Sequence, residues 1–481
     1  MSDAIASRHF TEADQQAFAA LSGDRNPLHM DAVAARRTQI GAIAVHGMHT
    51  ISWALDQLAQ RPDVRARGVG SLQVRFLSAI RLGDRVELHP GRSTDQAQTF
   101  QVRVDQANVA MIKLTPGASN GEAGVPDESG TIESLTLFER DPETLEGRRG
   151  RVPPVARLES FARAFPNAAA WLGADRLRGF AALSALVGME CPGLHSIFWS
   201  LDIALDEDRA EPGIAYEATG YDERFRMVRM AVRGSGLTGQ VEAVSRMPPI
   251  EQSSIADLRK IVADGAFAGQ RALVIGGSRG LGELTAKMLA AGGAEICLTY
   301  FMGDGDAERV VGAIEAAGGS GAALRYDAGL PAAAQLDALP FEPTHLYYFA
   351  TRQIAGRRQA MFEPARFESF TDVYVRGFHD ICEALLARGA GPLVAFYPSS
   401  VFVETKEGDF VEYAMAKAAG EILAACMANT LARLSVIVER LPRLPTDQTG
   451  SIRALEMASP NAVMLPILIA AQARFLAAAA K

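Results

Sequence analysis

One short stretch near the N-terminus constrains this chain more than any other: Leu21-Ser-Gly-Asp-Arg-Asn-Pro-Leu-His29. A glycine and a proline inside it interrupt the helical spacing of apolar residues that runs up to it. Asp24, Asn26 and His29 place an acid, an amide and an imidazole on this one connection. Such a composition predicts an active site. The alternative is a capped turn in which the Asp and Asn side chains bind backbone amides.

The segments that follow predict an α+β domain. Residues 45–59 have a helical pattern that is apolar on most of its surface, which is typical of a buried helix. Residues 72–76, 100–104 and 108–114 alternate between apolar and polar side chains, which predicts strands, and Gly83-Asp84 is a turn between them. One buried helix followed by long antiparallel strands is the pattern of a hot-dog fold.

Two motifs in this region carry a family resemblance. Residues 18–29 resemble the hydratase-2 signature of MaoC-like (R)-specific enoyl thioester hydratases, in which Ser-Gly-Asp-x-Asn-Pro-Leu-His follows an aromatic residue. Val45-His46-Gly47-Met48 resembles the family's Ala-His-Gly-Met at the start of its central helix. The resemblance covers about residues 8–115 and implies a catalytic hot-dog domain over residues 1–117.

Hydration or dehydration of an enoyl thioester needs a base, an acid and donors for the enolate oxygen. We expect Asp24 and His29 to form the acid–base pair and Asn26 to orient groups around them. The resemblance implies that the backbone N–H of Gly47 helps to hold the thioester oxygen, at a helix N-terminus that favours negative charge.

A metal site is the alternative use of the histidines in this region. His46 and His49 lie three apart on the expected helix, and His29 is available to join them. No carboxylate or cysteine completes a convincing ligand set, so we expect no metal.

A weaker second copy of the pattern is expected over residues 131–250, after a linker rich in Gly, Ser and Glu at residues 117–130. A helical segment at 171–187 precedes strand-like segments near 200–205, 213–219, 226–232 and 239–244. The hydratase signature is absent from this copy. Resemblance to double hot-dog proteins implies a degenerate half that widens the acyl-chain tunnel. His195 there is assigned no role.

From Gln270 onward, short apolar strands alternate with helical segments, which predicts a parallel, doubly wound α/β Rossmann sheet over residues 266–481. A glycine-rich turn joins the first strand to the first helix, and such a turn lets the backbone approach a pyrophosphate. The candidate cofactor-binding residues of this turn are Gly276, Ser278, Arg279, Gly280, Leu281 and Gly282.

Tyr413 and Lys417 are four residues apart and therefore share one helix face. Lys417 is expected to lower the pKa of the phenol and to bind a ribose, so that Tyr413 exchanges a proton with a carbonyl or hydroxyl. Ser400 follows an apolar strand and is expected to orient the same oxygen. With the glycine turn, these residues make the region 266–450 similar to a short-chain dehydrogenase/reductase.

The chain departs from that family at several positions. After the fourth strand, Phe349-Ala350-Thr351-Arg352 replaces Asn-Asn-Ala-Gly, and only Ala350 matches. The family's helix Asn falls near Val375-Arg376, where no Asn is present, and Leu441-Pro442-Arg443 replaces Pro-Gly. A water relay or the turnover is expected to differ.

The end of the second strand favours NADPH over NAD. Thr299-Tyr300-Phe301 contains no acid to bind a ribose 2′-hydroxyl, and Arg279 is placed to meet a 2′-phosphate. Asp304 and Asp306 keep NAD as the alternative. By the same resemblance, Tyr300, Asp327 and Ala350 are expected to contact the cofactor, Asp327 at its adenine.

Two sites on one chain predict consecutive steps: NADPH-dependent reduction of a 3-oxoacyl thioester, then loss of water to a 2-enoyl thioester. The acyl group is expected on CoA or acyl carrier protein, and the resemblance implies a homodimer. One alternative is degradative hydration followed by NAD-dependent oxidation. In another, one region serves only acyl binding or dimerisation.

Charge and composition narrow the partners further. The net charge of −8 is spread along the chain without a basic patch, so neither nucleic acid nor a membrane surface is expected. The four cysteines lie far apart, and no signal-peptide pattern is seen, so reduced thiols and a cytoplasmic location are expected. The apolar segment 461–481 contains Pro466 and Arg474, which favours a docking helix over a membrane span.

Overall fold

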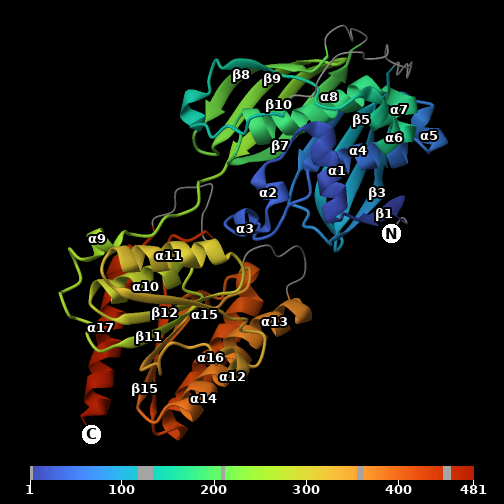
Figure 1. Cartoon of the computed structure of the whole chain (residues 1–481). Coiled ribbons are helices and arrows are strands. Elements are labelled where there is room, and N and C mark those ends of the chain that lie inside the picture. The colour runs from blue at the N-terminus through green and yellow to red at the C-terminus, as the bar shows by residue number, and fades with distance from the viewer. Residues whose placement is uncertain (1–3, 118–133, 207–211, 355–361, 448–456, 481) are drawn as a thin grey trace. The chain divides into compact units, whose positions relative to one another are not determined.

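The computed structural model describes residues 4–117, 134–206, 212–354, 362–447 and 457–480 (Figure 1). They divide into two compact units, which adjoin in the sequence at Pro248 and Pro249. The expected segments 1–117 and 131–250 both fall in the first unit, and 266–481 falls in the second. These three boundaries stay predictions. Most of the expected linker at 117–130 lies outside the described residues.

A ten-stranded antiparallel sheet runs through the first unit, in the order β1-β3-β4-β5-β2-β7-β10-β9-β8-β6. The strands of its first half are β1 (Ala6–His9), β2 (Ser71–Phe76), β3 (Arg85–Ser93), β4 (Gln98–Val104) and β5 (Ala107–Thr115). Those of its second half are β6 (Arg149–Val152), β7 (Ser196–Leu205), β8 (Ile214–Asp222), β9 (Met227–Gly234) and β10 (Leu237–Ser245). The halves join where β2 pairs with β7, with Val74 opposite Leu201.

The two halves repeat one topology. In the first half, the strands stand in the order first, third, fourth, fifth, second, counted from the outer edge. The second half has the same order from its own outer edge, β6-β8-β9-β10-β7. A long helix follows the first strand in each half: α4 (Gly47–Leu58) and α8 (Ala174–Ala185). The weak second copy expected from the sequence therefore has a counterpart in the strand order.

Helix α1 (Glu12–Ser22) begins at a capping box formed by Thr11 and Asp14. The Asp14 N–H donates to the Thr11 hydroxyl at 3.2 Å, and the Thr11 N–H donates to the Asp14 carboxylate at 2.8 Å. The remaining helices of this unit are α2 (Pro27–Met30), α3 (Ala32–Ala35), α5 (Pro62–Arg65), η1 (Pro142–Thr144), α6 (Leu158–Ala164), α7 (Pro166–Leu172) and the π-helical η2 (Leu186–Glu190).

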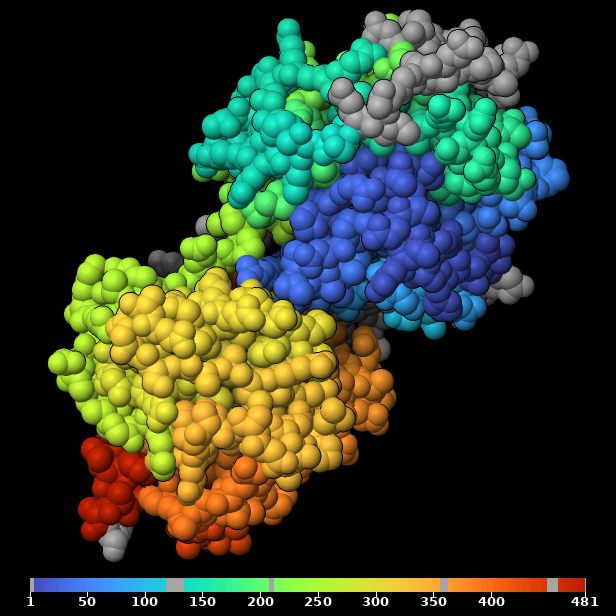
Figure 2. Space-filling model, in the orientation of Figure 1, coloured from blue at the N-terminus to red at the C-terminus, as the bar shows by residue number. Residues whose placement is uncertain are grey.

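Helix α8 packs against both α1 and α4 (Figure 1). In the space-filling view, the blue surface of the first residues adjoins the teal and green surface of residues from the second half (Figure 2). Segments more than 100 residues apart in the sequence thus form one apolar core, which contains Phe18, Met48, Phe180 and Leu183.

The second unit is built on a six-stranded parallel sheet in the order β13-β12-β11-β14-β15-β16. Counted along the chain this is the order 3-2-1-4-5-6 of a Rossmann fold. The strands are β11 (Arg271–Ile275), β12 (Glu295–Tyr300), β13 (Ser320–Arg325), β14 (His345–Tyr348), β15 (Leu393–Ser400) and β16 (Leu434–Leu441). The expected parallel, doubly wound sheet is present.

Helices cover both faces of this sheet. Alternate residues of β11 point to opposite faces, so Ala272 and Val274 enter one core while Leu273 and Ile275 enter the other. The helices are α9 (Ile255–Leu258), α10 (Gly280–Ala291), α11 (Asp304–Ala316), α12 (Ala332–Gln335), α13 (Pro364–Thr371), the π-helical η3 (Asp372–Gly377), α14 (Phe378–Arg388), α15 (Phe402–Thr405), η4 (Gly408–Phe410), α16 (Val411–Thr430) and α17 (Pro460–Ala479).

Helix α17 is long and apolar enough, by length and composition, to pass as a membrane span. It packs against α10 and β15, and Met464, Leu468 and Ala471 are buried in the core of the second unit. Its role as a docking helix rather than a membrane span stays a prediction.

Candidate active sites

The signature stretch folds as two linked helix caps. Gly23 ends α1 with φ of +79°, a conformation that favours glycine, and its N–H donates to the Ala19 carbonyl at 2.9 Å. Asn26 then caps α2, since its side-chain oxygen accepts from the Leu28 N–H at 3.0 Å. Asp24 lies between these two caps, so its backbone is held on both sides.

The Asp24 carboxyl is almost fully buried, with 1% of the residue exposed. Its Oδ2 accepts from the Ser184 hydroxyl at 2.7 Å, and its Oδ1 accepts from the Asn26 N–H at 3.2 Å. Burial raises the pKa of Asp24, while His29 and these two donors oppose the rise. A carboxyl in this setting takes and releases a proton closer to neutral pH than an exposed one.

Two histidine rings stack at 4.1 Å beside this carboxyl. The Nδ1 of His29 lies 2.7 Å from the Ala44 carbonyl and therefore carries the proton, which leaves its Nε2 for chemistry. The Nε2 of His46 lies 3.0 Å from the Asp24 carbonyl and donates to it. Burial keeps the pKa of His46 well below its usual value, so this ring stays neutral.

Asp24, His29 and His46 are also close enough together to be considered as metal ligands. The Nε2 of His46 is a donor to a carbonyl, so it presents no lone pair to an ion. This contact favours the expectation of no metal, which stays a prediction.

Gly47 is the first residue of α4, and its N–H therefore lies outside the helix's own hydrogen-bond ladder. A Cβ at this position would lie 2.9 Å from the Phe76 ring, so a glycine is required for the close approach. The helix N-terminus attracts negative charge, which makes this N–H a suitable donor to a thioester oxygen.

The second half supplies residues to this site that the sequence analysis missed. Besides Ser184, the Gly188 carbonyl accepts from the side-chain amide of Asn26 at 2.7 Å. Gln15 was missed as well: its side-chain amide donates to the carbonyls of His29 and Ala44 at 3.1 and 2.9 Å. A glycine inside an apolar helical segment was the one available signal for Gly188; the sequence contains no comparable signal for Ser184 or Gln15.

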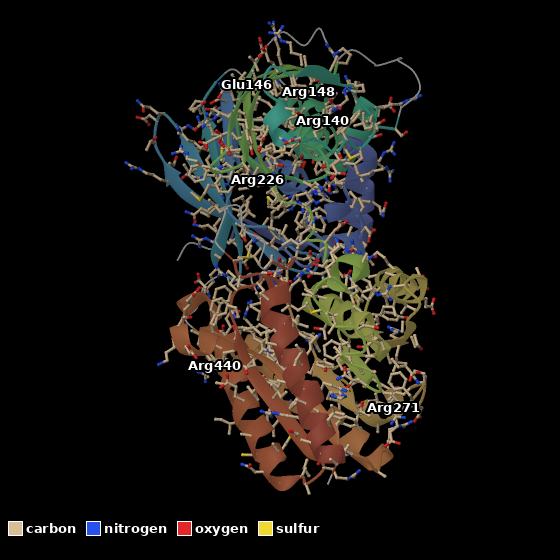
Figure 3. All side chains as sticks on the ribbon, turned by 90° about the vertical axis from the view of Figure 1, so that its left-hand side faces the viewer. Arg140, Glu146, Arg148, Arg226, Arg271 and Arg440 are labelled. Carbon is tan, nitrogen blue, oxygen red and sulfur yellow. The ribbon has the colours of Figure 1, made fainter. Side chains whose placement is uncertain are left out.

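His195 and its surroundings lie outside the acid–base cluster. The His195 ring is 2.9 Å from the Glu139 carboxylate. Arg140 and Arg148, close together in Figure 3, both donate to the Glu190 carboxylate. These contacts give His195 and the charged side chains near it a structural explanation. His195 is again assigned no catalytic or binding role.

In the second unit, the glycine turn connects β11 to α10 as expected. Gly276 and Gly280 have φ of +74° and +58°. A Cβ at Gly282 would lie 2.2 Å from the Gly276 oxygen, so that glycine permits close packing of the helix on the turn. At Gly280 the nearest atom to such a Cβ, on the Thr446 side chain, is 3.9 Å away, so no backbone atom crowds the N-terminus of α10 there. An anionic phosphate fits this arrangement.

The other residues predicted to bind the cofactor are placed around this turn or at the ends of neighbouring strands. In the turn, the Arg279 guanidinium lies 3.4 Å from the Asp447 carboxylate. Ser278 is buried, and Leu281 packs on the core of the second unit.

The remaining predicted residues lie at or after the ends of strands. Tyr300 is the last residue of β12. Asp327 accepts from the Gly329 N–H at 2.9 Å, and Ala350 follows β14, next to Gly276. Their roles as cofactor contacts stay predictions.

Ser400, Tyr413 and Lys417 meet at the carboxyl end of β15 and the start of α16. Ser400 is the last residue of β15, whereas the sequence placed it just past the strand. Burial raises the pKa of Tyr413 to about 12, and a hydrogen bond with the Ser400 side chain opposes the rise. The expectation that Lys417 lowers the pKa of this phenol is therefore wrong: burial dominates, and Lys417 is not among the groups that shift it. The Tyr413 phenol therefore carries a proton at neutral pH and can donate it.

Lys417 is buried, and burial lowers its pKa to about 7. Its ammonium donates to the Pro398 carbonyl at 2.6 Å and lies 4.0 Å from the centre of the Tyr374 ring and 5.9 Å from that of Tyr413. Tyr374 belongs to η3, the segment in which the related family has its Asn, and its hydroxyl bonds to the Thr351 hydroxyl.

Comparisons with known proteins find a family match for the N-terminal part of the first unit. Residues 2–113 match the family model described as MaoC like domain. A 3-hydroxybutyryl-CoA dehydratase of Methylorubrum extorquens is 31% identical over 84 residues, which are 18% of this chain and 54% of that protein. The chain thus spans about half the length of this curated relative.

Solved structures resemble the chain over about two fifths of its length. A short-chain dehydrogenase of Burkholderia cenocepacia in complex with NADP has 25% identity and a TM-score of 0.39, over 43% of this chain and 91% of that one. A 3-oxoacyl (acyl-carrier-protein) reductase of Agrobacterium tumefaciens with NADP bound has 22% identity and a TM-score of 0.38, over 43% and 88%.

Residues 2–113 are therefore a MaoC-like domain of the hot-dog fold, which confirms the resemblance that the two motifs carry. The second unit has the strand order of a Rossmann fold, with the glycine turn at the start of α10 and Ser400, Tyr413 and Lys417 around the carboxyl end of β15. The chain therefore joins a MaoC-like domain to a Rossmann domain, and the short-chain dehydrogenase/reductase type of the latter stays a prediction.

Proposed function

We propose that this chain is a bifunctional enzyme that reduces a 3-oxoacyl thioester and dehydrates the resulting (R)-3-hydroxyacyl thioester. The observation that carries the dehydratase is the buried Asp24 carboxyl beside His29 at the MaoC-like site. The name of the relative, a 3-hydroxybutyryl-CoA dehydratase, supports a thioester substrate. The reductase is supported by Ser400, Tyr413 and Lys417 at the edge of a Rossmann sheet.

Dehydration breaks the C2–H and C3–O bonds of the hydroxyacyl thioester. One member of the Asp24–His29 pair accepts the C2 proton, and the pair returns a proton to the C3 hydroxyl, which leaves as water. Negative charge develops on the thioester oxygen during this step, and the Gly47 N–H at the start of α4 stabilises it.

Reduction adds a hydride to C3 and a proton to its oxygen. NADPH would supply the hydride, and the glycine turn at the N-terminus of α10, with Gly276 and Gly280, would hold its phosphates. Tyr413 donates the proton, and Ser400 orients the carbonyl oxygen. β12 ends in Tyr300 without an acid, which favours a 2′-phosphate over a ribose 2′-hydroxyl, and Arg279 of the glycine turn, which pairs with Asp447 at 3.4 Å, would be the cation that meets it.

One rival has a specific observation in its favour. The Lys417 ammonium donates to the Pro398 carbonyl and lies 4.0 Å from the centre of the Tyr374 ring, so part of its donor capacity is used within the unit. This favours a second unit that binds an acyl group or forms a dimer without turnover. The degradative direction, hydration followed by oxidation with NAD, is the other rival.

Two variants of the full chain test both activities. We expect wild type to convert acetoacetyl-CoA and NADPH to crotonyl-CoA, read by mass. Asp24→Asn should stop at 3-hydroxybutyryl-CoA, and Tyr413→Phe should leave acetoacetyl-CoA unreduced yet still hydrate crotonyl-CoA, each with a loss of about 10³-fold in the affected step.

Equal reduction by wild type and Tyr413→Phe would eliminate the reductase. Faster turnover with NAD and a 3-hydroxyacyl thioester than with NADPH would favour the degradative direction.

The finer features belong to the same proposal. The repeated strand order supports a double hot-dog arrangement of the first unit. Presentation of the acyl group on CoA or acyl carrier protein, a homodimer, a cytoplasmic location and no membrane partner stay predictions.

A further inference from the structure

We infer that Ser184, on helix α8 of the second half, is a positioning residue that holds the Asp24 carboxylate in its reactive orientation. The second half, although it lacks the hydratase signature, then completes the dehydratase site. The contacts that support this inference all lie within the first unit. The effect of Ser184 on catalysis rests on the proposed dehydratase activity.

The contact is buried on both sides. Ser184 and Asp24 are 4% and 1% exposed, and the Ser184 hydroxyl lies 2.7 Å from Oδ2. The Asn26 N–H donates to Oδ1, so each carboxylate oxygen has its own donor. Water has little access to this position, and the loss of the hydroxyl would leave Oδ2 without a replacement donor.

The segment after Ser184 is shaped to receive the signature residues. The helix changes to a π-helical turn at Leu186–Glu190, a distortion often found at functional sites. Within this turn the Gly188 carbonyl accepts from the Asn26 side chain at 2.7 Å. A Cβ at Gly188 would lie 2.4 Å from Asp24 Oδ1. One segment therefore contacts both Asp24 and Asn26.

Few titratable groups face Asp24, so a change in the pH dependence of activity can be assigned to its carboxyl. The titratable groups facing it are His29, which lowers its pKa, and His46, whose Nε2 is 4.0 Å from Oδ2. On η2, the Glu190 carboxylate is held by two guanidinium groups. The charged residues of α8 lie at least six positions before Ser184; they are Asp175, Arg176 and Arg178.

Ser184→Ala in the full chain tests the inference, with hydration of crotonyl-CoA as the assay. A donor to an ionised oxygen favours the carboxylate, so its removal raises the pKa of Asp24 further. We expect the pH at which kcat/KM falls on the acidic side to rise by about one unit. We also expect kcat to fall about tenfold, with KM nearly unchanged. Ser184→Thr keeps the hydroxyl and should restore the wild-type limb.

Ser235→Ala is the matched control. Ser235 is a buried serine of the same half, 2% exposed, and its hydroxyl accepts from the Gly213 N–H, away from Asp24. We expect this variant to keep the wild-type pH profile. The inference is overturned if Ser184→Ala keeps the wild-type acidic limb, or if Ser235→Ala moves the limb equally.

A second measurement separates this inference from the proposed function. In protein labelled with ¹³C at the aspartate carboxyls, Asp24→Asn identifies the Asp24 signal, which is titrated in wild type and in Ser184→Ala. A shift of the titration midpoint in a protein that hydrates no crotonyl-CoA would refute the dehydratase but retain the contact. Identical midpoints in an active enzyme would refute only the role of Ser184.

Discussion

At the scale of single residues, burial shifts the acids and bases of both sites toward their neutral forms. The pKa of Asp24 rises, that of Tyr413 rises to about 12, and that of Lys417 falls to about 7. In the reductase site the shifts leave a protonated phenol beside an amine that titrates near neutral pH. In the proposed reduction, we expect protonated Lys417, whose ammonium lies 5.9 Å from the centre of the Tyr413 ring, to stabilise negative charge on the phenol oxygen as the proton leaves.

The charge of Lys417 should therefore appear in the pH dependence of reduction. Below about pH 7 the free enzyme carries Lys417 as a cation, and above it as an amine. The Glu421 carboxylate raises the pKa of Lys417. We expect kcat/KM for NADPH to fall as the pH rises through about 7, and Glu421→Gln to move this break to lower pH.

Glu404→Gln is the control for that experiment. Arg440, labelled in Figure 3, donates to the carboxylates of both Glu404 and Glu421. Glu404 is not among the groups that shift Lys417. A break that moves equally in both variants would assign the effect to Arg440 rather than to the charge of Glu421.

At the scale of elements, the two halves of the first unit are tied together by a helix cap supplied from another helix. The N-terminus of α7 has no cap from its own preceding residue. Asp56 of α4 takes that place, since its carboxylate accepts from the N–H groups of Asn167 and Ala168 at 2.8 and 3.0 Å.

Asp56→Ala should therefore destabilise the first unit. The substitution leaves two N–H groups of a helix N-terminus without their buried acceptor. We expect the free energy of unfolding to fall by about 2 kcal/mol, measured by urea denaturation. Asp63→Ala, at an exposed position, serves as the control and should stay within about 0.5 kcal/mol of wild type. Equal losses in the two variants would contradict the capping role.

At the scale of the whole molecule, the continuous sheet of the first unit sets where the chain can be divided. We expect residues 1–248 alone to keep dehydratase activity within about threefold of the full chain, because all described contacts of Asp24 lie within them. Residues 1–117 alone should be inactive, since they expose the β2 edge and lack Ser184. Wild-type activity from residues 1–117 would contradict this.

Much of this organisation was predictable from the sequence. The caps around Asp24, the helix that begins at Gly47 and the Tyr413–Lys417 pair all depend on neighbours within a few residues, so local spacing is enough to predict them. The alternation of strands and helices predicted the Rossmann sheet in the same way. The sequence did not predict the partners of Asp24 and Asp56 in the second half, because their contacts join segments more than 100 residues apart.

By itself, the sequence predicted a MaoC-like domain, a Rossmann domain and the candidate reacting groups of each, because helix periodicity, caps and short motifs are local properties. Only the tertiary structure decided that the two halves of the first unit share one site. Asp24 and Ser184 are 160 positions apart, and their contact exists because β2 pairs with β7 and places α8 against α1 and α4. Burial at that junction, which no local pattern encodes, raises the pKa of the Asp24 carboxyl.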